Sequence, residues 1–408
     1  MPRLLAGWSK REISVPVGFP LAGYIARRCL CQGALDPLFV RTLVLKQGEK
    51  TAVLVVADLL MISSTWATKL RRRLSEMAGT NPEAVVVAAT HTHSGPVVDS
   101  GPFNFSSVTA KESQAREVVQ GIEQRAAEAL REALKFVQPV EVSAAHVMIR
   151  EVATDRNLPE RSKAQPFFLL RFSAPSGSAL FSTLACHATV LGAKNCLASG
   201  DLHGAAARLL ERDAQVALVA NPASANVSTR FTRRSQTPGE LARLARLVVE
   251  QARAARFHKL NAPTLTLRTR RVCFTLANLA AEVPECVAQR GRLATVAREA
   301  RLIRKRLAAA REFSSGRLRI PIVTLRLGNV AIAALPFENC IDTGRFLWRH
   351  SRVMLMCCAN GYWGYMPSRS ARANDYEAVS SLFGRDADGQ LRKKLSHLSL
   401  AGRSPVVE

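Results

Sequence analysis

The stretch AVVVAATHTHSGP, residues 84–96, joins an apolar run to two histidines and a Gly-Pro turn. A short continuous apolar run bounded by turn residues indicates a strand that is buried on both faces. Side chains alternate between the faces of an extended strand, so we expect His91 and His93 on one face. Thr90 and Thr92 are expected on the other face. Two imidazoles at a strand end suit a metal site or an acid–base pair, although the motif alone leaves a structural role open.

Strand and helix patterns alternate on both sides of this stretch. Residues 41–60 indicate two strands that turn at Gly48, and residues 65–79 indicate a helix capped by Ser64. Further strands are expected at residues 140–150, 167–174, 179–191, 216–221, 264–276, 322–338 and 352–362, and further helices at 111–137, 204–214, 238–257 and 277–312. The pattern predicts one large α/β domain, residues 1–395, with mixed β-sheets flanked by helices and a loosely held tail at 396–408.

The charge and composition limit the classes of partner. The 408 residues carry a formal net charge of +25 with a hydrophobic content of 48%, which is typical of a globular chain with a strongly basic surface. The basic clusters are dispersed, without interleaved aromatic residues or a nucleic-acid-binding motif, so a nucleic-acid partner is disfavoured. A solvated basic surface is the simplest interpretation, and an anionic membrane surface or an anionic substrate stays open. The oligomeric state stays open as well.

The cysteines and the apolar segments bear on the compartment. The nine cysteines are scattered, and no CxxC spacing indicates a zinc ribbon or a thioredoxin-like motif. Most are expected to be small buried hydrophobic residues. No apolar run reaches the ~18 residues of a membrane span, and the N-terminus has no apolar signal segment. These features predict a cytoplasmic protein.

Several motifs occur in an order that is typical of one enzyme family. They are THTHSGP at residues 90–96, LACHATVLGAKNCLASGDLHG at 184–204, SANVSTRFTRR at 224–234, LPFENCIDTGRFL at 335–347 and NGYWGYMPSRSARANDYE at 360–377. With the opening AGWSKREISVPVGFPLAGYIAR, residues 6–27, they resemble the neutral (non-lysosomal) ceramidase family of zinc-dependent amidases. The resemblance covers residues 6 to about 380, and THTHSGP and NGYxGYxP are its most specific parts.

The resemblance implies a zinc site and a reaction. The implied ligands are His91, His187, Glu338 and Tyr365. Two imidazoles, a carboxylate and a phenol oxygen, with water completing the shell, form a chemically sensible open zinc site. Zinc would then activate a water molecule for attack on an amide carbonyl.

The resemblance also implies residues that contact the reacting group. His93 would support the metal ligands or face the substrate. Ser228 would hydrogen-bond the amide or the leaving group, and Arg156 and Tyr376 would stabilise developing oxyanion charge. Asp58 and Asp201 are candidates for orienting the ligand histidines. Structural interpretations compete with each of these roles: a core histidine, a helix N-terminal carboxylate, or a packing aromatic residue.

Three departures from the family pattern bear on specificity. Ala225-Asn226 stands where the family has Gly-Asp, Phe337 stands where it has glycine before the glutamate, and the interval from Tyr365 to Tyr376 is one residue short. The family's C-terminal β-sandwich and secretory signal are not found. We expect a zinc-dependent amidohydrolase acting on a small-molecule or lipid N-acyl amide. The alternatives are a binding protein that keeps the fold without turnover, and a basic protein that binds lipid or nucleic-acid surfaces.

Overall fold

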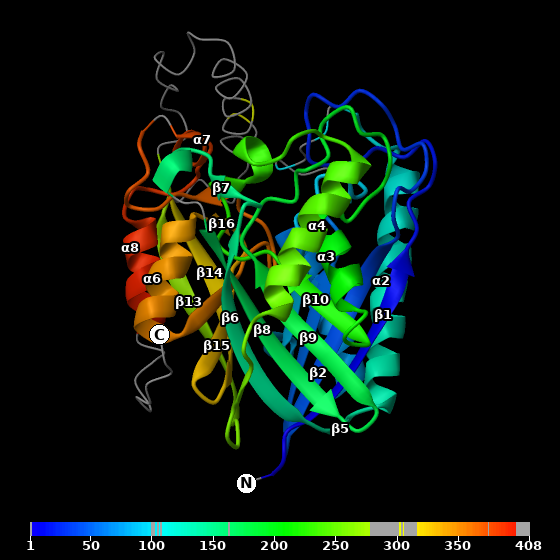
Figure 1. The fold of residues 1–408 in the computed structure, drawn as a ribbon, viewed down its shortest axis with the longest axis vertical. Coiled ribbons are helices and arrows are strands. Elements are labelled where there is room, and N and C mark those ends of the chain that lie inside the picture. The colour runs from blue at the N-terminus through cyan, green and yellow to red at the C-terminus, as the bar shows by residue number, and fades with distance from the viewer. Residues whose placement is uncertain are drawn as a thin grey trace.

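Three large β-sheets, with helices on their outer faces, form the body of the computed structural model over its described residues (Figure 1). The structure describes residues 2–98, 108–161, 164–277, 316–373 and 375–396, together with the isolated residues 103, 106, 302 and 305. The predicted α/β class with mixed sheets flanked by helices is confirmed.

The first sheet contains the opening stretch. Its strands lie in the order β4 (Val85–Ala89), β3 (Lys50–Ala57), β2 (Leu38–Gln47), β1 (Leu5–Ile13) and β5 (Gln138–Pro139). Strands β2 and β3 form the predicted hairpin, and Gly48 at its turn has φ 57°, a left-handed conformation that glycine adopts without strain. The pair β3–β4 is parallel, whereas the other pairs are antiparallel.

The second and third sheets repeat this mixture of pairings. The second contains β10 (Val216–Ala220), β9 (Gly177–Leu184), β8 (Ala164–Ala174), β6 (Glu141–Arg150) and β12 (His258–Lys259). The third contains β13 (Leu265–Thr275), β14 (Arg317–Leu327), β15 (Val330–Ala334) and β17 (Val353–Met356). The parallel pairs are β9–β10 and β15–β17. Two short pairs complete the strands: β7 (Thr154–Asp155) with β11 (Val227–Ser228), and β16 (Glu338–Asn339) with β18 (Tyr365–Met366).

Helices cover the outer faces of the sheets (Figure 1). They are α1 (Ser64–Ala78), α2 (Glu112–Lys135), α3 (Asp201–Leu210), α4 (Pro238–Arg253), α6 (Ile341–Ser351), α7 (Tyr376–Val379) and α8 (Ala387–Ser396). Helices α1 and α2 pack on the first sheet, α3 and α4 on the second, and α6 and α8 on the third. Single 3-10 turns occur at η1 (Pro82–Ala84), η2 (Pro159–Arg161) and η3 (Thr229–Phe231).

Alternation along the strands divides the apolar side chains between an inner and an outer core. Leu43 and Leu45 of β2 lie in a core that also contains Phe181 of the second sheet and Ile332 of the third. Val44, between them, faces the opposite side and packs with residues of α1 and α2. The inner core therefore fixes the three sheets against one another, which is the expected result of period-two patterning with both faces covered.

Each large sheet has one parallel strand pair, and each pair leads toward the same region. Strand β4 ends at Ala89, β9 at Leu184 and β15 at Ala334. His91, His187 and Glu338 follow within a few residues of these three ends. Loops beyond the carboxyl ends of parallel strands are where open α/β sheets place their sites.

Some details differ from the sequence predictions. Helix α1 begins at Ser64, and the Ser63 side chain, rather than that of Ser64, accepts a hydrogen bond from the Trp66 N–H as its cap. Most of the helix predicted at 277–312 lies outside the described residues, as does the tail after Ser396. The domain boundaries therefore stay a prediction. Among the described residues, no helix is both long and apolar enough to span a membrane.

Candidate active site

The predicted metal ligands and substrate-contacting residues line one cavity of about 670 Å³. They are His91, His93, Arg156, His187, Ser228, Glu338, Tyr365 and Tyr376. The residues come from six different parts of the chain, so the fold brings together what the sequence separates by up to 285 positions (376 − 91). The volume lies within the usual range of small-ligand cavities.

The two histidines of the opening stretch reach the cavity by a route that the sequence did not indicate. Strand β4 ends at Ala89, and His91 has φ 65°, so the chain is not extended through the motif as predicted. The Thr92 hydroxyl donates a hydrogen bond to the Ser199 carbonyl at 2.7 Å. The threonine thus anchors a turn rather than prolonging a strand. The rings of His91 and His93 nevertheless meet edge to face, with centroids 5.0 Å apart.

His187 also lies beyond its strand, because β9 ends at Leu184. Its N–H donates to the Val227 carbonyl of β11 at 2.9 Å. The next residue, Ala188, forms a parallel bridge with Thr92. This bridge places the two histidine-bearing loops side by side.

Each of the three cavity histidines is oriented by a backbone carbonyl. The Nδ1 atoms of His91, His93 and His187 lie 2.8, 2.8 and 2.9 Å from the carbonyl oxygens of Leu60, Gly23 and Ser224. A carbonyl only accepts, so each Nδ1 carries the proton that it donates. In its neutral state each imidazole then presents the lone pair of its Nε2 to the cavity, which is the form that binds metals.

Glu338 adds a buried carboxylate to these lone pairs. Its Oε2 lies 3.2 Å from His91 Nε2 and 3.0 Å from His187 Nε2, and its side chain is 1% exposed. Burial lowers the pKa of His91, but the Glu338 carboxylate outweighs burial and raises that pKa well above its usual value. A carboxylate oxygen at this spacing from two imidazole nitrogens is stabilised by a proton on one of them or by a cation bound among the three groups.

The spacing also fits a metal. Ligands about 2.0–2.1 Å from a tetrahedral zinc ion are ~3.3 Å apart, close to the two separations around Glu338. Tyr365 Oη lies 3.4 Å from His187 Nε2. The predicted set His91, His187, Glu338 and Tyr365 is thus compatible with one ion.

His93 lies nearer to this group than its predicted role requires. Ring nitrogens of His91, His93 and His187 all lie within 4.8 Å of one another, so these three residues can hold a metal ion. His93 Nε2 is buried and has no hydrogen-bond partner among the described residues. Burial and the two neighbouring histidines lower the pKa of His93 well below its usual value. The geometry therefore leaves His93 as either a further ligand or a neutral acceptor of a proton.

A guanidinium and two phenols form the neighbouring wall. Arg156 Nε donates to Glu377 Oε1 at 2.7 Å, and Glu377 is fully buried. The Arg156 guanidinium carbon lies 5.0 Å from the Tyr376 ring centroid, and the Tyr365 and Tyr376 rings meet edge to face at 5.3 Å. The buried Glu377 thus fixes the direction of Arg156 toward the cavity.

The altered loop around Ser228 is well bonded. The Asn226 side chain donates to Asp155 Oδ2 at 2.7 Å and accepts from the Ile341 N–H at 2.8 Å. Asn226 therefore ties the Arg156 strand to the start of α6. Ser228 Oγ accepts a weak 3.4 Å bond from the Arg230 N–H as the cap of η3.

Phe337, which stands where the family has glycine, is accommodated by packing. Phe337 is fully buried, and its ring meets those of Phe274 and Phe383 at 5.9 and 5.4 Å. It therefore belongs to the core behind Glu338.

The prediction that Asp58 and Asp201 orient the histidines is wrong. Asp58 forms a buried ion pair with Arg41, with Oδ2 2.9 Å from Nη1. Asp201 accepts bonds from the N–H groups of Val190 and Leu191, and its burial raises its pKa to about 6. Both carboxylates hold the framework of the site rather than its imidazoles.

Other cavity residues were not assigned from the sequence. Tyr362 donates a hydrogen bond to Glu338 Oε1, and Gly23 supplies the carbonyl that holds His93. Tyr362 stands in the motif at residues 360–377 and Gly23 in the motif at residues 6–27. These motifs could therefore have identified both residues as candidates for the site. Glu377, which supports Arg156 from outside the cavity lining, is the last residue of the same quoted motif as Tyr362. Arg230 and Arg233 also line the cavity.

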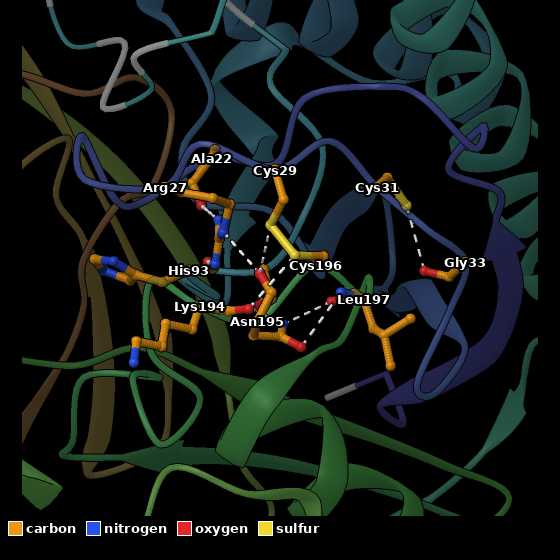
Figure 2. Close-up of a disulfide and its surroundings, with 11 residues drawn as sticks. Ala22, Arg27, Cys29, Cys31, Gly33, His93, Lys194, Asn195, Cys196 and Leu197 are labelled. Atoms are coloured by element: carbon orange, nitrogen blue, oxygen red, sulfur yellow. Dashed lines mark hydrogen bonds between the residues drawn. A yellow bond between two sulfur atoms is a disulfide. The ribbon is translucent and has the colours of Figure 1, made fainter.

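The Cys29–Cys196 disulfide joins two loops near His93 (Figure 2). Cys29 and Cys196, 167 residues apart, are bonded, and the nearby Arg27 donates to the carbonyls of Ala22, His93 and Asn195. Nothing local in the sequence indicates this pairing. Of the described cysteines outside the disulfide, all are buried except Cys273, as the sequence indicated for most of them. Disulfides are typical of oxidising compartments, which argues against the cytoplasmic prediction.

Fold and site together define a class: an α/β protein with a candidate metal centre of imidazoles and a carboxylate beyond the ends of parallel strands. The family model described as neutral/alkaline non-lysosomal ceramidase, N-terminal, matches residues 5–234, more than half of the chain. The chain belongs to this family, which indicates a hydrolase of amide bonds. Glu338, Tyr365 and Tyr376 lie beyond the residues that the family model matches. Their place in the site therefore rests on the structure and not on this match.

Solved structures agree with this assignment at the level of the fold. A ceramidase complexed with C2 superposes with a TM-score of 0.76 at 18% identity, covering 98% of this chain and 75% of that one. The neutral ceramidase from Pseudomonas aeruginosa gives a TM-score of 0.77 at 18% identity, covering 98% of this chain and 74% of that one.

Proposed function

We propose that this chain is a zinc-dependent amidohydrolase that cleaves a linear N-acyl amide. The observation that carries the proposal is the convergence of imidazole Nε2 atoms on the buried Glu338 carboxylate, each imidazole being fixed by a backbone carbonyl. His91, His187, Glu338 and Tyr365 would hold the ion. Bound there, zinc supplies Lewis acidity toward the amide carbonyl and lowers the pKa of a water molecule to about 7.

The remaining cavity residues have roles that follow from their chemistry. His93, neutral and with its Nε2 facing the cavity, accepts a proton near the scissile amide and returns it to the leaving amine. Arg156, held by Glu377, and the Tyr376 hydroxyl stabilise the negative charge that develops on the carbonyl oxygen. Ser228 hydrogen-bonds the amide or the leaving group.

The names of the structural relatives point to ceramide, which is an N-acyl lipid, and we include it among the candidate substrates. The cavity accommodates a small-molecule or lipid amide around the scissile bond. An anionic membrane surface, attracted by the net charge of +25, would concentrate a lipid substrate.

Hydrolysis of a panel of N-acyl amides, ceramide included, tests the proposal. The purified protein is assayed as isolated, after chelation, and after zinc is returned. We expect activity that chelation abolishes and zinc restores. Full activity in metal-free protein would contradict zinc dependence, and binding of amides without any cleavage would favour the non-catalytic alternative.

A further inference from the structure

One wall of the cavity carries positive charge that the proposed reaction does not use. Ser228, Arg230, Arg233 and Gln236 all line the cavity from a single segment between β11 and α4. Ser228 lies at the proposed reaction centre. The segment therefore runs along the cavity from the scissile bond outward.

Arg233 is held firmly in this wall. Its Nη1 donates to the Thr189 carbonyl at 2.5 Å and to Thr229 Oγ1 at 3.4 Å, and its backbone N–H donates to the Thr229 carbonyl. Thr189 stands two residues after His187. The guanidinium is thus fixed beside a proposed zinc ligand rather than free to swing into solvent.

The partners of Arg233 are neutral. Within the described part of the chain, no carboxylate forms an ion pair with it, and its Nε and Nη2 have no hydrogen-bond partner. Arg156 is instead paired with Glu377. Of the two lining carboxylates, Glu338 faces His91 and His187, and Asp375 accepts a bond from the Arg372 N–H. Among the described residues, neither carboxylate forms an ion pair with Arg233.

The surrounding packing preserves the shape of this wall. Gln236 fills the space beside Gly192, where an added Cβ would lie 2.5 Å from Gln236 Nε2. The loop that carries Thr189 and the segment that carries Arg233 are consequently packed together. A fixed, half-buried guanidinium with two open N–H groups matches the planar oxygens of a carboxylate or the oxygens of a phosphate.

We infer that the substrate is an N-acyl amide bearing an anionic oxygen group, a carboxylate or phosphate, which Arg233 binds. This inference rests on the proposed amidase function and narrows its substrate class. A neutral amide offers no negative charge to the Arg233 guanidinium. The carboxylate or phosphate of an anionic amide forms charge-assisted hydrogen bonds with it. The overall charge of +25 would also accelerate capture of such a substrate at low salt.

Matched pairs of substrates test the inference. N-dodecanoylglycine is compared with N-dodecanoylethanolamine, which replaces the carboxylate by a hydroxymethyl group on the amine side. An N-alkyl succinamate is compared with the N-alkyl 4-hydroxybutanamide for an anion on the acyl side, and N-dodecanoyl phosphoethanolamine tests phosphate. We expect kcat/KM to favour the anionic member of at least one pair by about 10- to 100-fold, and Arg233→Gln to reduce that ratio by at least about 10-fold.

Arg234→Gln is the control, since Arg234 belongs to the same segment but does not line the cavity. Calorimetric binding of N-dodecanoylglycine to metal-free protein gives a readout that does not require turnover, and Arg233→Gln should weaken it by a similar factor.

Equal kcat/KM for both members of every pair, unchanged in Arg233→Gln, would overturn the inference and leave the amidase proposal standing. No cleavage of any amide, with tight binding that depends on Arg233, would instead overturn the amidase proposal alone. A loss of preference in Arg234→Gln as large as in Arg233→Gln would show a general field effect and overturn the assignment to Arg233.

Discussion

Two walls of the same cavity are built in different ways. The strand-end wall, made of His91, His187 and Glu338, follows the ends of parallel strand pairs, and its side chains are at most 2% exposed. The loop wall, residues 18–36 and 228–236, consists of long connections held by a disulfide, turns and side-chain bonds. The first wall has the rigidity that metal ligands need, and the second is made of loops, where residues that select a substrate are commonly found.

The largest expected effect comes from the strand-end wall. Glu338→Gln keeps the shape of the side chain but removes the negative charge that faces the two imidazoles. We expect loss of zinc and a fall in kcat greater than the ~10- to 100-fold typical of outer partners of a metal ligand. The same substitution at the exposed Glu141 is the matched control. Retention of zinc and normal turnover in Glu338→Gln would remove Glu338 from the metal site.

The two histidines of THTH sharpen the comparison, because they lie on the boundary between the walls. His91 is held by Leu60 and His93 by the Gly23 carbonyl of the loop wall. We expect His91→Ala to lose zinc and activity together. His93→Ala should keep most of its zinc and lose kcat by ~100-fold or more.

Metal content and kcat of both variants decide this prediction, with the exposed His258→Ala as control. Equal loss of zinc in His91→Ala and His93→Ala would make His93 a ligand, as its place in the three-histidine group permits.

Removing the disulfide measures how much the stability of the loop wall depends on this covalent bond. Cys29→Ser with Cys196→Ser opens a link across 167 residues, which should cost about 2–4 kcal/mol in the free energy of unfolding. Zinc content should change little, because the ligands follow strand ends. Chemical unfolding with and without a reductant measures the cost, and reductant should not affect the double variant. Loss of zinc on reduction alone would show that the two walls are not independent.

A smaller effect is expected at Asn226. Asn226→Asp restores the family's carboxylate but sets it against Asp155 Oδ2, which now accepts a 2.7 Å bond from the amide. We expect Asn226→Asp to lower the free energy of unfolding by about 1–3 kcal/mol near neutral pH. The two carboxylates raise each other's pKa in the folded state, so folding favours proton uptake and the deficit should shrink as pH falls. A deficit that grows toward low pH would contradict this explanation; unfolding curves at several pH values measure it.

The sequence predicted the strand-end wall far better than the loop wall. Strand β4 and the hairpin at Gly48 follow directly from apolar runs and turn residues, and motif resemblance identified residues that the fold does bring into one cavity. The route of His91 was missed, because a left-handed φ in a histidine depends on the Thr92–Ser199 bond, 107 positions away. The Cys29–Cys196 bond and the Glu377 support of Arg156 were missed for the same reason, since contacts distant in sequence leave no periodic signal.

Metal analysis of the purified wild-type chain is the most direct test of whether the histidine–glutamate cluster binds zinc. The protein is stripped with a chelator, dialysed against zinc, freed of excess metal and analysed beside Glu338→Gln. We expect about one zinc per folded wild-type chain and far less in the variant. Folded wild-type protein that retains no zinc, or a Glu338→Gln variant that retains as much as wild type, would contradict this expectation.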